Sequence, residues 1–288
     1  MSNARQHDQF YTRKDLALRL TECVRANCAP KEDEFQWLEP SAGSGSFLDA
    51  MPAGAHGLDL EPRHPGVKEG NFLFWAPCEE DRRPWMVVGN PPFGKNASQA
   101  IKFFNHAASF AHTIAFIVPR TFEKSSVQKR LNRQFHLKLQ EVLPLDSFEF
   151  EGQPYSVPCV FQIWERGHSE REHVQLPLTH LDFEYTTRAR GDFAFQRVGV
   201  KAGAVKALPN ENLAAPSHHF IRVCDRSQIE AVRDRLKNLD WEAVKHRTAG
   251  NPSISKAEMV ALYAQEMERL SAKTASSPPA FASERAAA

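Results

Sequence analysis

Apolar runs alternate with amphipathic stretches along the first 166 residues of the chain. The apolar runs predict strands over residues 35–38, 56–60, 85–88, 113–119, 137–143 and 157–164. The stretches between them predict helices over residues 13–20, 46–50, 97–110 and 124–135, the first of them capped by Thr12. Because strands and helices alternate, we expect a mostly parallel, doubly wound α/β sheet. The last two strands have no helix between them, so we expect an antiparallel hairpin at the sheet edge.

The alternation is lost after about residue 167. A short strand-like piece at residues 193–198 and a late helix at residues 227–239 stand among loops. We therefore predict one domain over residues 1–167 and a small α+β module over residues 168–271. Residues 272–288 are rich in Ala, Ser and Pro and are expected to form a disordered tail.

The composition is that of an ordinary globular protein. The chain has 288 residues, 42% of them hydrophobic and 25% charged, which is enough for one α/β domain and a smaller module. No apolar run is long enough to cross a bilayer, so we expect no membrane partner, and the polar N-terminus does not look like a secretory signal. The formal net charge of +1 neither supports nor excludes a nucleic-acid partner.

Cysteine and histidine usage gives no sign of a metal site. The five cysteines are scattered without a CxxC pair, which favours reduced thiols in a cytoplasmic protein. The twelve histidines show no HExxH spacing, and the adjacent pair His218-His219 is more simply explained as loop surface. We therefore expect chemistry that needs no metal.

Asn90-Pro91-Pro92-Phe93 directly follows the apolar run at residues 85–88. Two consecutive prolines cannot continue a strand ladder or a helix interior, so the strand must end in a stiff, extended turn. In a doubly wound sheet this turn lies at the carboxyl ends of the strands, where ligands bind. The Asn90 side-chain oxygen and the Pro91 carbonyl would then be two fixed neutral acceptors, which suit the two N–H donors of an exocyclic amino group.

Two further features fall at the same sheet edge. Gly43 and Gly45 lie between a predicted strand and helix, where glycine lets the backbone approach a ligand closely. Alone this pair is weak evidence, because the third glycine of the dinucleotide fingerprint is missing. Asp59 ends the next strand, where a carboxylate can accept from ribose hydroxyls. Taken by itself, Asp59 is better explained as a turn residue before Pro62.

Five motifs follow one another along the chain: Phe10-Tyr11-Thr12, residues 39–48, Asp59, residues 70–73 and Asn90-Pro91-Pro92-Phe93. In this order they resemble the N6-adenine DNA methyltransferases that use S-adenosylmethionine. The resemblance is to the group whose cofactor motifs precede the catalytic motif and whose target-recognition region is C-terminal. It spans residues 10–166 and implies a Rossmann-like methyltransferase sheet. Residues 1–167 would then be the S-adenosylmethionine-binding catalytic domain, and residues 168–271 the target-recognition, DNA-binding module.

The resemblance also implies the roles of single residues. The implied catalytic residues are Asn90, Pro91, Pro92 and Phe93. The implied cofactor-binding residues are Tyr11, Thr12, Glu39, Pro40, Ser41, Ala42, Gly43, Gly45, Asp59, Leu60, Asn71 and Phe72. The chain departs from the family at Asn71, which stands where the family usually has Asp, and at Arg13, which stands where a proline is common. The Asn71 amide oxygen is expected to accept from the cofactor's adenine amine without the charge of a carboxylate.

Methyl transfer to adenine requires the base to leave the duplex, and Phe93 is expected to stack on it. Tyr155 and Phe150 are candidates for the second stacking aromatic, although ordinary core packing explains both equally well. Lys124 begins a basic helix that is either a solvated face or a phosphate contact. Arg188, Arg190, Arg197 and Lys201 interleave with aromatic residues, which favours a DNA-facing surface. Residues 248–256 faintly resemble the end of target-recognition domains in restriction-modification enzymes.

The leading hypothesis is a DNA adenine-N6 methyltransferase that acts on double-stranded DNA by base flipping. An enzyme that methylates RNA adenine or a protein glutamine is the alternative, since similar turns occur there. A catalytically inactive, methyltransferase-like DNA-binding subunit is the other alternative, and the intact turn argues against it. The Tyr11-Thr12 motif and the basic C-terminal module favour DNA. The recognition sequence, a partner nuclease and the oligomeric state are left open.

Overall fold

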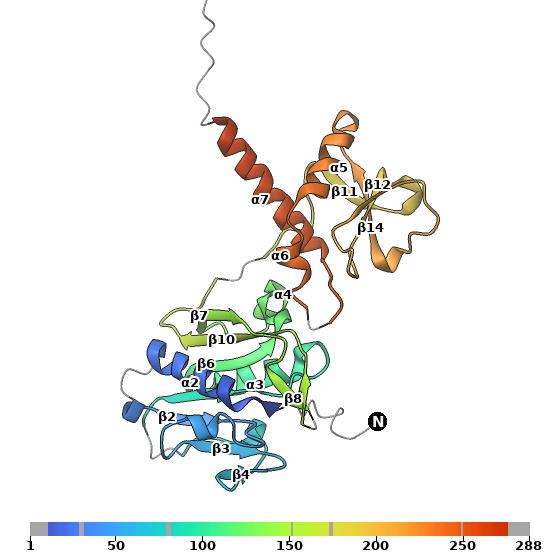
Figure 1. Ribbon diagram of the computed structural model, residues 1–288. Helices are drawn as coiled ribbons and strands as arrows, with labels where there is room; N and C mark the ends of the chain where they lie inside the picture. The colour runs from blue at the N-terminus through green and yellow to red at the C-terminus, as the bar shows by residue number, and fades with distance from the viewer. Residues whose placement is uncertain are drawn as a thin grey trace, which may run out of the picture. The chain divides into compact units, whose positions relative to one another are not determined.

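The computed structural model describes residues 11–28, 32–78, 82–150, 152–172, 175–248 and 250–275. These residues form two compact units, coloured from blue to yellow-green and from yellow to red in Figure 1. The first unit runs to Gln175 and includes Arg247–Gly250, and the second comprises Leu176–His246 and the chain from Asn251 onward. The domain boundary predicted after Gly167 directly follows the last strand of the first unit. The first unit extends beyond it to Gln175, and Arg171 donates a hydrogen bond to the Asn132 carbonyl of that unit.

The described part of the first unit contains a seven-stranded sheet in the order β4-β3-β2-β5-β6-β10-β7. Strands β4, β3, β2, β5 and β6 pair in parallel, whereas β10 runs antiparallel to both β6 and β7. The predicted doubly wound, Rossmann-like sheet with an antiparallel hairpin at its edge is therefore confirmed. The strands are β2 (Gln36–Glu39), β3 (His56–Asp59), β4 (Val67–Glu69), β5 (Trp85–Gly89), β6 (Ala111–Pro119), β7 (Phe135–Val142) and β10 (Cys159–Arg166).

Both faces of this sheet are covered. In β5 all five residues are buried, and successive side chains point to opposite faces. Trp85 and Val87 belong to the core that contains α3 (Ser98–Ala107), while Met86 and Val88 belong to the core that contains α2 (Lys14–Cys28). The continuous apolar run in the sequence reflects this two-sided burial. It also places the polar turn at Asn90 where the strand leaves the core.

A second, three-stranded sheet in the order β1-β8-β9 lies in the same unit. It consists of β1 (Tyr11–Thr12), β8 (Phe148–Phe150) and β9 (Gln153–Tyr155), all paired antiparallel. Thr12 is opposite Phe148, which is fully buried. The segment that precedes α2 is therefore held by the β8–β9 hairpin, which comes more than 130 residues later in the sequence of the same unit.

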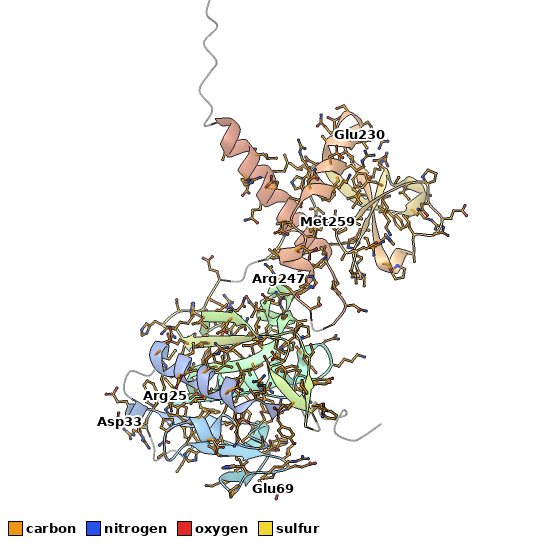
Figure 2. All side chains as sticks on the ribbon, in the orientation of Figure 1. Arg25, Asp33, Glu69, Glu230, Arg247 and Met259 are labelled. Atoms are coloured by element: carbon orange, nitrogen blue, oxygen red, sulfur yellow. The ribbon has the colours of Figure 1, made fainter. Side chains whose placement is uncertain are left out.

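The second unit is an antiparallel sheet in the order β11-β14-β12-β13, packed against helices. Phe193, Ile221 and Tyr263 are at the centre of its core, and Met259, labelled in Figure 2, is completely buried beside them. The predicted small α+β module is confirmed. Its elements are β11 (Phe183–Thr186), β12 (Phe193–Gln196), β13 (Val205–Ala207), β14 (His218–Val223), α5 (Ile229–Asn238), α6 (Glu242–Lys245) and α7 (Lys256–Ala275).

Two of the predicted helices of the first unit are much shorter than expected. The helix predicted at residues 46–50 is a 3₁₀ turn, Leu48–Ala50. The helix predicted at residues 124–135 is the single turn α4 (Ser125–Gln128). At the end of this turn and beyond it, the guanidinium of Arg171 donates to the carbonyls of Gln128, Leu131 and Asn132. The first two are carbonyls that the predicted helix would have used internally.

At both ends of the chain the structure also differs from the sequence-based prediction. The helix predicted at residues 13–20 continues to Cys28, and Thr12 does not cap it, since Thr12 Oγ1 is buried without a hydrogen-bond partner. The predicted disordered tail begins too early, because α7 continues through Ala275. Residues 276–288 and Phe10 lie outside the described residues. Among the helices of the described ranges, none combines the length and the apolar character needed to span a bilayer.

Candidate functional site

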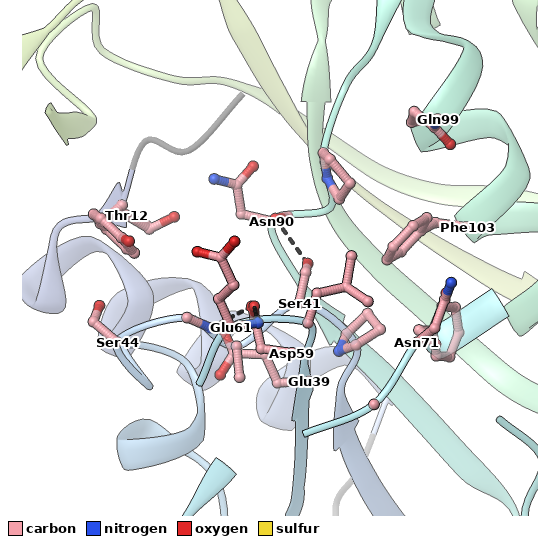
Figure 3. Close-up of a pocket in the computed structure, with 18 of the residues that line it drawn as sticks. Thr12, Glu39, Ser41, Ser44, Asp59, Glu61, Asn71, Asn90, Gln99 and Phe103 are labelled. Atoms are coloured by element: carbon pink, nitrogen blue, oxygen red, sulfur yellow. Dashed lines mark hydrogen bonds between the residues drawn. The ribbon is translucent and has the colours of Figure 1, made fainter. Parts of the chain in front are cut away.

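A cavity of about 420 Å³ opens at the carboxyl ends of β2, β3 and β5 (Figure 3). Its wall brings together segments that are far apart in the sequence, from β1 to α3. Most of the predicted cofactor-binding residues line it, together with two residues of the predicted catalytic turn. These residues are Tyr11, Thr12, Glu39, Pro40, Ser41, Ala42, Gly43, Asp59, Leu60, Asn71, Phe72, Asn90 and Pro92.

The glycine loop after β2 forms one side of the cavity. Gly43 has φ +46°, a left-handed conformation that side chains other than glycine rarely adopt. A Cβ on Gly43 would lie 2.9 Å from Cε1 of Tyr11, so the absence of a side chain allows β1 to pack against this loop. Gly45 also has a positive φ but does not line the cavity, and a Cβ there would meet His64 instead. The two predicted glycines therefore serve different contacts.

Asp59 connects the end of β3 to the glycine loop. Its Oδ2 accepts from the Gly43 N–H at 2.7 Å, and its Oδ1 accepts from the Glu61 N–H at 2.8 Å. These bonds hold the carboxylate in one orientation at the cavity wall. Each oxygen keeps a lone pair for a hydroxyl donor, so the bonds are compatible with the predicted role toward a ribose.

Glu39 is the one carboxylate buried at the bottom of this wall among the described lining residues. Its side chain is 3% exposed, and its Oε2 accepts from the Leu48 N–H at 2.7 Å. Burial raises the pKa of Glu39 well above its ordinary value, and bonds from the Leu48 and Phe47 N–H groups only partly offset this. Glu39 therefore both ends β2 and fixes the short turn after the glycine loop.

The turn after β5 presents Asn90 to the cavity. The Ser41 hydroxyl donates to the Asn90 backbone carbonyl at 3.0 Å, a bond marked in Figure 3. The Asn90 side-chain oxygen, Oδ1, is buried and has no hydrogen-bond partner. A buried acceptor left unpaired is rare in a folded protein and calls for an explanation. At a cavity wall, the explanation that the geometry favours is a ligand with an N–H donor.

Phe93 and Pro91 do not line the cavity. Phe93 is 6% exposed and packs in the α2-side core with Leu143, Phe148 and Phe161. In this arrangement the ring cannot stack on a base in the cavity, and such a role would require it to leave the core. The Pro91 carbonyl as an acceptor and Phe93 as a stacking ring therefore stay predictions.

The loop before β5 closes the other end of the cavity. Asn71 Oδ1 accepts from the Leu73 N–H at 3.0 Å and so caps the 3₁₀ turn Phe72–Phe74. Phe72 is buried, with its ring centroid 5.1 Å from that of Phe103 and 4.8 Å from that of His106. This end is therefore aromatic and flat-walled, which suits a heterocycle.

Several lining residues were not predicted. Gln99 and Phe103 lie four residues apart on α3, and the same helical face points at the cavity, so their spacing was a usable signal. Glu61, Leu73 and Gly94 adjoin predicted residues and carried no signal of their own. Ser44, Ser46 and Gly70 also line the cavity, and all three lie inside the predicted motifs at residues 39–48 and 70–73.

At the N-terminal side, Tyr11 and Thr12 complete the wall. The Arg63 guanidinium is 5.5 Å from the centre of the Tyr11 ring, which holds the ring over Gly43. Thr12 is 6% exposed, and its Oγ1 is a second buried polar atom without a partner at the cavity. Two unpaired polar atoms in one cavity strengthen the case for a polar ligand.

The predicted substrate-contacting residues fall in two groups. Phe150 and Tyr155 face each other across the β8–β9 hairpin with ring centroids 5.8 Å apart, and Lys124 directly precedes α4. In the second unit, Arg188 donates to the Glu211 carbonyl and Arg197 to the Pro216 carbonyl. Arg188, Arg190 and Lys201 are exposed on that unit.

In the described ranges, no three His, Cys, Asp or Glu side chains are grouped so as to hold a metal ion. The five cysteines are unpaired. Burial raises the pKa of Cys28 to about 12. Burial also raises the pKa of Cys23 and Cys159, so none of these three thiols has the lowered pKa of a nucleophile.

No protein-family profile matches the chain, and no curated protein matches it at a significant level. Among solved structures, the chain is similar to a candidate RNA methyltransferase from Pyrococcus horikoshii. The match includes 56% of this chain and 88% of that chain, with 12% sequence identity and a TM-score of 0.44. The match to the M protein of the type I restriction enzyme EcoKI includes 93% of this chain and 71% of that chain, with 16% sequence identity and a TM-score of 0.41.

The type IIL restriction-modification enzyme MmeI, solved in complex with DNA, covers 64% of this chain and 44% of its own, with 14% identity and a TM-score of 0.37. At these identities the likenesses concern the fold. Methyltransferases are thus among the proteins that this chain is similar to.

Proposed function

We propose that this chain transfers a methyl group from S-adenosylmethionine to the N6 amino group of an adenine flipped out of double-stranded DNA. The observation that carries the proposal is the unpaired, buried Asn90 Oδ1 at the wall of a cavity that also contains Gly43, Asp59 and Asn71. The order of the sequence motifs supports the same function.

The residues at the cavity fit S-adenosylmethionine. Asp59 carries acceptors for ribose hydroxyls, and the rings of Phe72 and Phe103 provide apolar surface for a purine. Because Gly43 has no side chain, Tyr11 packs directly on the glycine loop and both line the cavity. When bound, S-adenosylmethionine supplies a methyl group on a positively charged sulfur, which is already a strong electrophile.

The role of Asn90 follows from hydrogen-bond donors and acceptors. The adenine amino nitrogen is a poor nucleophile because its lone pair is delocalised into the ring. Asn90 Oδ1 accepts a hydrogen bond from one N–H group of the adenine amine. This bond favours a more tetrahedral nitrogen, whose lone pair is then free to react. The Ser41 hydroxyl, which holds the Asn90 carbonyl, keeps this acceptor in position before substrate arrives. Bound S-adenosylmethionine would supply the methyl group, with neutral S-adenosylhomocysteine as the leaving group, and the methylated amine would release one proton to water.

The second unit is proposed as the DNA-binding module. Arg188, Arg190 and Lys201 are exposed there, and Arg197 reaches its surface. Lysine and arginine contacts to phosphates supply affinity and position the duplex, while unstacking the adenine costs a few kcal/mol.

The test of the proposal is transfer of a labelled methyl group to three substrates: duplex DNA, RNA and a glutamine-containing protein. We expect label in DNA, on N6 of adenine, identified by mass spectrometry of the digested nucleosides. Label in RNA or protein alone would contradict the DNA assignment. Absence of label in every substrate, with intact DNA binding, would favour an inactive DNA-binding subunit.

A further inference from the structure

The cap of the turn Phe72–Phe74 determines which way the Asn71 amide faces. Asn71 Oδ1 accepts from the Leu73 N–H at 3.0 Å. Turning the amide over would place its NH₂ group against that N–H, with two donors facing each other. The hydrogen bond therefore directs the oxygen toward the backbone and leaves the Nδ2 group as the free end of the side chain.

This free end belongs to the cavity. Asn71 is half-buried and lines the cavity, and none of the described residues accepts a hydrogen bond from its Nδ2 group. Figure 3 shows Asn71, Phe103 and Gln99 at the end of the cavity away from Thr12. A flat heterocycle packed against Phe72 and Phe103 would present its polar edge at this end.

Because one oxygen of residue 71 is used in the cap, asparagine and aspartate present different groups to the heterocycle. An aspartate would cap the turn with one oxygen and direct its second oxygen, an acceptor, at the heterocycle. Asparagine makes the same cap and directs a donor there instead. The sequence-based expectation was that the Asn71 oxygen accepts from the adenine amine. That oxygen keeps a second lone pair, but the bond from the Leu73 N–H turns it toward the backbone of the 3₁₀ turn, so the Nδ2 group is the end of the side chain presented to a ligand.

We infer that Asn71 reads the purine of the bound nucleoside as a donor, from Nδ2 to an acceptor on the purine edge, and does not select for an exocyclic amine. The acceptor is a ring nitrogen of adenine or an oxo group at the same edge. This inference rests on the proposed function and concerns how the same cavity distinguishes its cofactor.

Isothermal titration calorimetry of the full chain tests it with two ligands, S-adenosylhomocysteine and S-inosylhomocysteine, which carries an oxo group in place of the amine. We expect the wild-type dissociation constants of the two to agree within about threefold, because Nδ2 finds an acceptor on either ligand. Asn71→Asp should raise the preference for the amino ligand by about tenfold or more, because its free carboxylate oxygen accepts from the amine and opposes the oxo group.

Two controls isolate the amide. Asn210 is exposed outside the cavity and its Oδ1 accepts from the Asn212 N–H at 3.1 Å, so Asn210→Asp changes the same kind of cap and should leave the ratio unchanged. Asn71→Ser retains an oxygen for the cap and removes the amide, and should weaken both ligands together.

The wild-type ratio alone is decisive if a variant does not fold. A wild-type preference for S-adenosylhomocysteine of about 100-fold or more would overturn the inference, as would an unchanged ratio in a folded Asn71→Asp chain. In both of these outcomes the nucleoside binds and the proposed function stands. If neither ligand binds the wild-type chain, the proposed function itself fails.

Discussion

A buried acceptor without a hydrogen bond, such as Asn90 Oδ1, costs a folded protein about 1–3 kcal/mol. The cost is explained if a ligand supplies the missing donor. The same Asn90 oxygen that lowers the stability of the ligand-free turn is therefore the group proposed to act on the substrate amine. Thr121 Oγ1 is also buried and unpaired but does not line the cavity, which makes it a natural comparison.

We predict that Asn90→Ala lowers the rate of methyl transfer by about 100-fold or more, because the acceptor for the reacting amine is lost. Binding of S-adenosylhomocysteine should change by less than about threefold, since other residues are proposed to hold the cofactor. Single-turnover transfer and calorimetry measure the two effects. Thr121→Ala should leave both unchanged, and undiminished transfer by Asn90→Ala would refute the catalytic role of Asn90.

Glu39 gives a prediction about pH. Because burial raises its pKa above the ordinary 4.5, the folded chain binds this proton more tightly than the unfolded chain does. Its stabilising contribution is fully present below pH 4.5 and is lost as the pH rises toward the raised pKa. In Glu39→Gln the amide oxygen can still accept from the Leu48 N–H, but the side chain no longer ionises.

We therefore expect the melting temperature of Glu39→Gln, relative to the wild type, to increase from pH 4.5 upward. In a domain of this size each kcal/mol corresponds to about 2–4 °C, so thermal unfolding across a pH series resolves the effect. Glu211→Gln, at an exposed position, should show no such trend. A constant difference across pH would mean that Glu39 is not the titrating group.

At the scale of elements, the site depends on loops held against one another by glycine. Gly43 and Gly54 both have positive φ, but a Cβ on Gly43 would meet the Tyr11 ring, whereas nothing lies within 4 Å of one on Gly54. The two positions therefore separate backbone strain from steric contact between the glycine loop and β1.

We predict that Gly54→Ala lowers stability by about 1 kcal/mol, the cost of a left-handed alanine, and that Gly43→Ala lowers it by more, because its Cβ would also meet the Tyr11 ring. Only Gly43→Ala should also weaken binding of S-adenosylhomocysteine, by about tenfold, because the new methyl group displaces Tyr11 from the wall. Denaturant unfolding and calorimetry measure the two effects. Equal loss of binding in both variants would show that the contact with Tyr11 is irrelevant.

Elements that are buried along all or nearly all of their length were the ones best predicted. The apolar runs at β5 and β6 have lengths and boundaries that two-sided burial produces, and proline ends β6 at Pro119. The basic helix at residues 124–135 was wrong because its end depends on Arg171, which lies far along the chain. No pattern within the segment itself records that contact.

At the scale of the whole molecule, two units divide the proposed work of cofactor binding and DNA binding. The exposed cations of the second unit provide the prediction for this scale. Replacing Arg188, Arg190 and Lys201 together with alanine should reduce the slope of log K against log salt for duplex DNA by about 2–3, since each phosphate contact contributes about 0.9.

Fluorescence anisotropy over a salt series measures this slope. Arg269→Ala is the matched control, because Arg269 is exposed in the same unit but pairs with Glu266. Cofactor binding should survive in the triple variant, since the cavity lies in the first unit. An unchanged slope would remove these cations from the proposed DNA surface.

The sequence by itself determined the alternation of strands and helices, the stop at Pro91-Pro92 and the order of the site segments. These follow from local sterics and from side-chain periodicity, which a single chain displays directly. Most of the predicted cavity residues came together for the same reason, because the carboxyl ends of parallel strands share one edge.

Only the tertiary structure decided the hydrogen-bonding state of each site residue. It left Asn90 Oδ1 unpaired, committed the Asn71 oxygen to Leu73, placed Phe93 in the core and buried Glu39. Burial and the supply of donors depend on groups brought together by the completed fold. The sequence therefore predicts which residues lie at the cavity. Which of their hydrogen-bonding groups are unpaired, and which side chains are buried, is decided by the packed molecule.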